Sequence, residues 1–251
     1  MKKELNYFYI GDSLGGNQEW FSGFMMKKGG CGAETACDIS VYLAKYFGMT
    51  NLYPYSLDPV EKDDYVRFAD KMRPYLSPRP MGINRLDIYM EGIEKYFRDA
   101  GSPELVTEPL AGDLPWEEAG KRLRDQIDAG YPVPCLILKH KNPKMEDYVW
   151  HWFLLIGYDV EDTPDAPNAR LRVKTVTYSE SQWLDFQELW EIPGKRRSYP
   201  AKTKGLLLSN CLIEKVPRIP KQKWKVEVKK KRATTESGFI PYPVVALFKR
   251  R

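Results

Sequence analysis

Residues 29–36 read GGCGAETA and place Cys31 between glycines where a helical pattern begins. From 32 to 47 the apolar side chains recur at helical spacing, and Gly48 follows as a stop. The unpaired N–H groups and the positive dipole end at a helix start stabilise a thiolate. Cys31 is therefore a candidate nucleophile, and we expect the glycines beside it to leave room for a substrate backbone. The alternative is a cysteine in a Gly-rich turn without a chemical role.

Residues 149–159 read VWHWFLLIGYD, an apolar strand with a single histidine, His151, near its start. An imidazole held in such an apolar strand, away from water, is suited to accept a thiol proton. A purely structural histidine is the alternative. The second histidine of the chain, His140, lies in the polar run KHKN at 139–142, which is typical of an exposed loop.

The pattern around these two segments predicts helices in the first half of the chain and strands in the second. Helices are expected at 32–47, 58–73, 84–100, 116–129 and, shorter, 185–191. Strands are expected at 133–139, 150–158, 171–178 and 206–214, with weaker candidates at 224–228 and 244–248. Helices followed by an antiparallel sheet indicate the α+β class, with a lobe boundary near 112–114.

The chain has 251 residues, 43% hydrophobic and 29% charged, a globular composition that predicts a sizeable core. No apolar run at the N-terminus resembles a signal peptide and none is long enough for a membrane span, so a cytoplasmic protein that does not bind membranes is expected. The four cysteines form no CxxC pair and only two histidines are present, so we expect free thiols and neither metal nor cofactor.

Charge is concentrated in residues 216–251, which hold eleven Lys/Arg and two Asp/Glu, whereas the rest of the chain holds 28 basic and 32 acidic residues. Lysines alternate there with Trp224, Val226 and Val228, which favours an exposed edge strand that packs on the same domain. A basic patch for nucleic acid is the alternative.

Together, the helix start at 30–32 and the strand at 151–159 resemble the papain-like cysteine peptidase superfamily, specifically its bacterial C39-like peptidase branch. Residues 116–135 resemble the helix-then-strand element of that branch, and the resemblance spans about 18–191. It implies a papain-like domain over 1–215, with a helical lobe to about 112 that carries the nucleophile helix and packs on a β lobe. The basic extension at 216–251 would follow this domain.

The resemblance also implies a thiolate–imidazolium pair of Cys31 and His151, with an upstream glutamine that donates to the oxyanion. The family places this glutamine six residues before the cysteine, where this chain has Met25. The nearest glutamine is Gln18, thirteen residues before Cys31, and it serves if residues 20–28 form an excursion that returns to the site. The alternative is an ordinary loop amide.

A third residue should orient the histidine, and the family has Asn or Asp on the next strand. Asp159 lies eight residues along the same strand, which is more than about 20 Å away. On the next strand Thr175 and Thr177 face inward, and a hairpin centred near Thr163 brings either beside His151. A hydroxyl accepts the imidazole N–H but stabilises imidazolium less than a carboxylate does. We therefore expect that His151 is a weaker base, that the enzyme has a narrow task, or that activity has been lost.

These features predict a thiol-dependent hydrolase, either a cysteine peptidase or an amidase, that forms an acyl-enzyme at Cys31 with a peptide or small amide substrate. An acyltransferase on the same site is one alternative. A catalytically impaired papain-like module that binds a peptide or protein is another. Nucleic-acid binding through residues 216–251 has the least support, because the basic residues follow no known motif.

Overall fold

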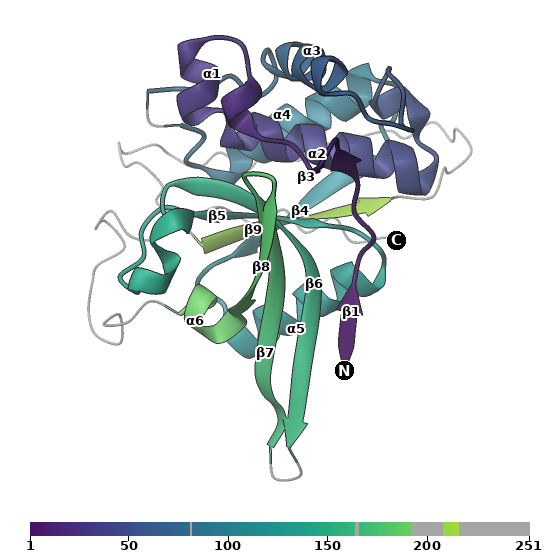
Figure 1. Cartoon of the computed structure of the whole chain (residues 1–251). Helices are drawn as coiled ribbons and strands as arrows, with labels where there is room; N and C mark the ends of the chain where they lie inside the picture. The colour runs from purple at the N-terminus through teal and green to yellow at the C-terminus, as the bar shows by residue number, and fades with distance from the viewer. Residues whose placement is uncertain (81, 164–165, 192–207, 216–251) are drawn as a thin grey trace, which may run out of the picture.

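A computed structural model gives the structure of the protein and describes residues 1–80, 82–163, 166–191 and 208–215. The chain folds as α+β (Figure 1). The helices are α1 (Phe24–Gly29), α2 (Cys31–Phe47), α3 (Lys62–Met72), α4 (Leu86–Asp99), α5 (Trp116–Asp128) and α6 (Phe186–Trp190). The strands are β1 (Lys2–Glu4), β2 (Tyr9–Ile10), β3 (Ser13–Leu14), β4 (Leu105–Ala111), β5 (Val133–Ile137), β6 (His151–Thr163), β7 (Ala166–Thr177), β8 (Glu180–Asp185) and β9 (Leu208–Lys215).

Helix α2 lies at the centre of the fold, because every residue from Cys31 to Ala44 is buried. It packs against β6 on one side and α3 on another, and Figure 1 shows α1 to α4 gathered on one side of the sheet. The helix ends at Gly48, whose φ of 68° is left-handed, as the glycine stop predicts. The first residue of this buried helix thus lies beside the start of β6.

Within the described part of the chain, the main sheet has seven strands in the order β4-β9-β5-β6-β7-β8, with β1 paired to β6, and all neighbouring strands are antiparallel. Strand β6 is the longest, and its hairpin with β7 extends away from the helical layer (Figure 1). Helices α5 and α6 pack against the strands on the side that is away from α1 to α4 (Figure 1). An antiparallel sheet in the second half of the chain is therefore confirmed.

The boundary expected near 112–114 does not separate a helical lobe from a β lobe. Strands β1 and β4 both precede it and both belong to the main sheet, where β1 pairs with β6 and β4 with β9. The second helix also begins later than expected, at Lys62, because Val60 is buried and Glu61 is still extended. The chain thus packs Val60 into the core before it turns into α3.

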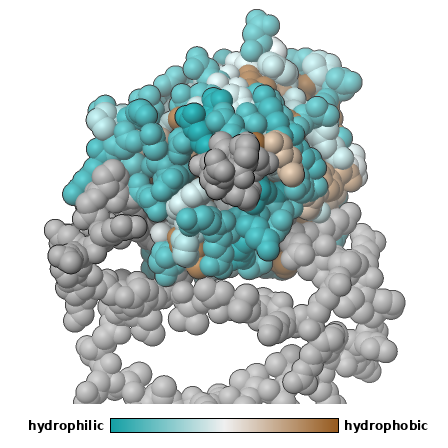
Figure 2. Space-filling model, turned by 90° about the horizontal axis from the view of Figure 1, so that it is seen from below, coloured by the Kyte–Doolittle hydropathy of each residue, from teal (hydrophilic) through white to brown (hydrophobic). Residues whose placement is uncertain are grey.

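None of the helices in the described residues is both long and apolar enough to cross a membrane. The described surface visible from below is mainly hydrophilic, with small hydrophobic areas (Figure 2). The strands expected at 224–228 and 244–248, and the whole extension at 216–251, lie outside the described residues.

Candidate active site

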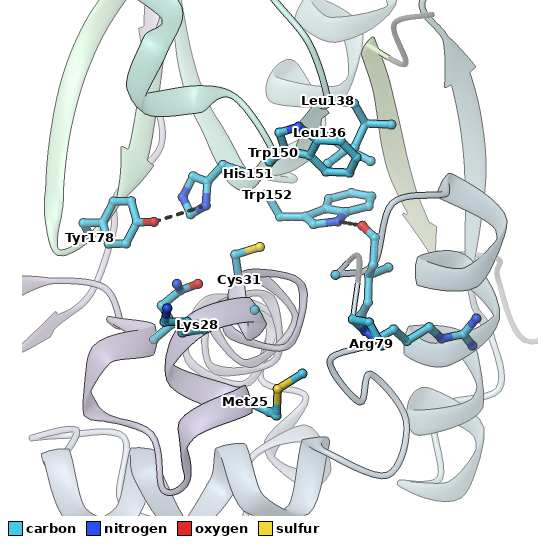
Figure 3. A pocket seen from close by; sticks show the side chains of 15 residues that line it. Met25, Lys28, Cys31, Arg79, Leu136, Leu138, Trp150, His151, Trp152 and Tyr178 are labelled. Carbon is cyan, nitrogen blue, oxygen red and sulfur yellow. Dashed lines mark hydrogen bonds between the residues drawn. The ribbon is translucent and has the colours of Figure 1, made fainter. Parts of the chain in front are cut away.

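One cavity of about 380 Å³ brings together residues that are far apart in the sequence. Gln18, Cys31 and His151 all line it. Figure 3 shows Cys31, His151 and Trp152 turned into the same space, with Tyr178 beside the imidazole and Arg79 on the opposite side. Three of the five predicted site residues therefore share one cavity wall.

Cys31 is the first residue of α2 and is only 7% exposed. Burial raises the pKa of its thiol to about 11, and the charge of Glu34 adds to this increase. The backbone N–H groups of Trp152, Gly32 and Cys31 itself lie close enough to the sulfur to lower its pKa, but burial outweighs them. The helix start therefore supplies the donors expected of it, although they do not ionise the thiol.

The glycines beside Cys31 have a different role from the one expected. A Cβ at Gly30 would lie 2.2 Å from the carbonyl oxygen of Met26, and a Cβ at Gly32 would lie 3.0 Å from Ile83. Neither glycine lines the cavity. Both therefore allow close packing of α1 and Ile83 on the helix start, and the room they provide is filled by protein rather than by substrate.

His151 begins β6 directly after Trp150, whose φ of 60° is left-handed and therefore strained. Its Nε2 lies 2.5 Å from the hydroxyl oxygen of Thr177. With the Nε2 hydrogen donated to this oxygen, Nδ1 carries the lone pair and is the atom able to accept a proton. Burial lowers the pKa of His151 to about 4.

The two threonines differ in their partners. Thr177 ends β7 and reaches His151, whereas the Thr175 hydroxyl lies 2.8 Å from the hydroxyl of Tyr148 and donates to the carbonyl of Gln182. The prediction that either threonine lies beside the histidine is therefore wrong for Thr175. The sheet register causes this difference. Val176 pairs with Leu154, so Thr177, and not Thr175, lies toward the start of β6.

Tyr178 is a site residue that the sequence did not reveal. Its ring stacks on the His151 imidazole with centroids 4.6 Å apart and planes at 4°, and its hydroxyl lies 3.5 Å from Nδ1. Tyr178 and Ser179 both have positive φ and join β7 to β8 as a two-residue hairpin turn. Such turns favour Asn-Gly, so the residues Tyr-Ser gave no local signal for this geometry.

Gln18 is buried in the cavity wall, although it lies outside any long element. Its Nε2 donates to the carbonyl of Lys27 at 3.1 Å, and its Oε1 is buried without a hydrogen-bond partner among the described residues. The bond fixes the amide orientation and leaves the second hydrogen of Nε2 for another acceptor. Residues 20–28, which include all of α1 except Gly29, thus form the expected excursion, and Met25 on α1 also lines the cavity.

The electrostatics of the site differ from those implied by the resemblance. Burial raises the pKa of Cys31 to about 11 and lowers that of His151 to about 4, and both shifts favour a neutral thiol beside a neutral imidazole. The only charged residues among the described lining are Lys28 and Arg79. The wall is otherwise largely apolar and aromatic, and it includes the exposed side chains of Met25, Trp150 and Tyr178.

Within the described residues, no group of three or more His, Cys, Asp or Glu side chains is arranged to hold a metal ion. Cys31, Cys37 and Cys135 are free thiols. Comparisons of the chain with models of known protein families, with curated proteins and with solved structures found no match.

Proposed function

We propose that the protein is a thiol-dependent hydrolase with a papain-like active site of the C39-like kind, acting on a peptide or small amide. The observation that carries this proposal is the shared cavity of Cys31 and His151, with Thr177 at Nε2 of the imidazole. A helix-start cysteine, a buried imidazole and a group that orients it are the parts that acyl transfer requires.

In the proposed reaction the Cys31 sulfur attacks the substrate carbonyl while Nδ1 of His151 accepts the thiol proton. The N–H groups at the start of α2 and the second hydrogen of Gln18 Nε2 donate to the developing oxyanion. His151 then protonates the leaving amine as the C–N bond breaks, which leaves a thioester on Cys31. A water molecule, deprotonated by His151, attacks the thioester and releases the acid and the thiol.

Two neighbours control the imidazole during these steps. Thr177 keeps the hydrogen on Nε2, so that Nδ1 stays available as the base. The ring of Tyr178 lies parallel to the imidazole and covers one of its faces, which keeps water away from it. The resting pair is neutral, so the proton moves during attack and not before it.

The lining also indicates a substrate preference. Lys28 and Arg79 are exposed, basic and free of acidic neighbours among the described lining residues. Exposed large apolar side chains at Met25, Trp150 and Tyr178 complete the wall. We therefore propose that the preferred substrates carry an acyl group that combines an apolar side chain with a carboxylate.

The function can be tested with p-nitrophenyl esters of N-acyl amino acids, which report acylation as a burst of p-nitrophenolate. The wild type should give a burst of about one equivalent, Cys31→Ala none, and His151→Ala a rate at least about 100-fold lower. Cys37→Ala is the matched control, because Cys37 is buried in the same helix and does not line the cavity. Equal bursts in wild type and Cys31→Ala would contradict the proposal.

A second candidate is a papain-like module that binds a peptide without cleaving it. The observation in its favour is that Thr177, and not a carboxylate or an amide, holds Nε2, while burial keeps the thiol neutral. This candidate predicts no burst in the wild type, with peptide binding by calorimetry that is lost on Trp150→Ala, since Trp150 lines the cavity and is exposed.

A further inference from the structure

Asp38 is a buried carboxylate on the nucleophile helix, seven residues after Cys31, and does not line the cavity. It accepts hydrogen bonds from three donors on other segments. The N–H of Gly16 lies 3.1 and 3.2 Å from its two oxygens, the Tyr7 hydroxyl donates at 2.8 Å and the Tyr65 hydroxyl at 2.6 Å. Three donors converge on a side chain that is only 1% exposed, which is an arrangement built for an anion.

The ionisation of Asp38 follows from its neighbours. Burial raises its pKa to about 6, whereas the bonds from Tyr65, Tyr7 and Gly16 lower it. Glu34, one turn earlier, has a pKa raised well above its usual value by burial and then by the charge of Asp38. The three donors face Asp38, so Asp38 is the member of the pair that is held as an anion.

The donor on Gly16 links Asp38 to the active site. Gly16 lies two residues before Gln18, in the loop between β3 and the short 3-10 helix at Gln18–Trp20. A Cβ at Gly16 would lie 2.0 Å from the Tyr65 hydroxyl, so only glycine fits this close approach. The Ser179 hydroxyl donates to the Gly16 carbonyl at 3.5 Å, which connects the same loop to the hairpin turn that carries Tyr178.

We propose that Asp38 is a positioning residue that holds the Gly16 loop against the nucleophile helix, so that Gln18 faces the cavity and donates to the oxyanion. This inference rests on the proposed hydrolase function. It assigns the GGNQ run at 15–18 a role that its sequence does not reveal, because the carboxylate that holds it lies on α2, 22 residues after Gly16. Asp38 acts through Gln18 and touches no reacting atom.

A double-mutant cycle on the ester burst tests this coupling. Gln18→Ala should lower the acylation rate about 100-fold, and Asp38→Ala about 10-fold. If Asp38 acts through Gln18, the double variant is no slower than Gln18→Ala alone. Ser40→Ala is the matched control, because among the described residues its buried hydroxyl bonds only to the Ala36 carbonyl, within α2. Additive effects of the two substitutions would overturn the proposal.

Amide hydrogen exchange at Gly16 tests the tether without any activity. Exchange should be at least about 10-fold faster in Asp38→Ala than in the wild type, and unchanged in Ser40→Ala. Asp38→Leu is close in size to the wild-type side chain and has no acceptor oxygen, so it replaces Asp38→Ala if that variant does not fold. Unchanged exchange at Gly16 overturns the proposal. If the wild type shows no burst, the hydrolase function fails while the exchange experiment still decides whether Asp38 holds the loop.

Discussion

The pH dependence of alkylation at Cys31 follows directly from its burial. A thiol whose pKa rises from 9.0 to about 11 has a thiolate fraction about 100-fold smaller at pH 7. The more basic thiolate is about 10-fold more nucleophilic, because reactivity rises with pKa at a Brønsted slope near 0.4–0.5. Iodoacetamide should therefore modify Cys31 about 10-fold more slowly than an ordinary cysteine at pH 7, and the rate should rise about tenfold per pH unit up to about pH 11.

The measurement is the rate of carbamidomethylation of the peptide that contains Cys31, followed by mass spectrometry between pH 5 and 10.5 with glutathione as reference. His151→Ala should change this rate by less than about threefold, because a neutral imidazole does not ionise the resting thiol. A rate that is independent of pH between 5 and 8, and faster than that of glutathione at pH 6, would refute the reasoning from burial. It would show a thiolate–imidazolium pair at rest.

Three further outcomes are expected. Thr177→Val removes the acceptor of the imidazole N–H and should lower acylation about 10-fold, whereas Thr175→Val should lower the melting temperature without lowering acylation per folded molecule. Tyr178→Ala exposes the imidazole and should raise its pKa from about 4 toward 6.5, as measured by NMR titration. The pH below which the acylation rate falls should rise by the same amount. Replacement of Lys28 and Arg79 by Glu should reverse the preference between acidic and basic acyl esters, measured as a ratio of kcat/KM, and an unchanged ratio would contradict the proposed substrate class.

Local sequence patterns predicted the long elements well. Helix α2 begins within one residue of its expected start, and α4, α5 and β5 lie close to their expected positions, since each carries a clear period of apolar residues. Strands β6 and β7 lie where expected at the sheet end, but each extends five residues further into the hairpin that they share. Strand β1 was not predicted because it is three residues long and reads KKE, which has no strand pattern. Its position depends on pairing with β6, more than 150 residues later, and no local pattern encodes such a contact.

In the candidate site, too, some residues could be predicted from local sequence and others could not. Cys31 and His151 begin regular elements, so their positions follow from local sequence. The choice between Thr175 and Thr177 depends on the register of β6 against β7, which is interrupted between Leu155 and Gly157. Tyr178 depends on the turn after β7, and pKa values depend on burial from all sides, so neither was available from the sequence.

The pairing of β1 has a consequence for how molecules behave at high concentration. On the side of β6 opposite β7, β5 covers the first part of the strand, and β1 covers residues Gly157 to Asp159. Without β1 this stretch would present free N–H and C=O groups on an extended strand flanked by the buried side chains of Ile156 and Val160. Such an edge accepts a strand from another molecule, and a chain that lacks β1 should aggregate through β6. The shortest strand of the main sheet therefore protects the solubility of the whole fold.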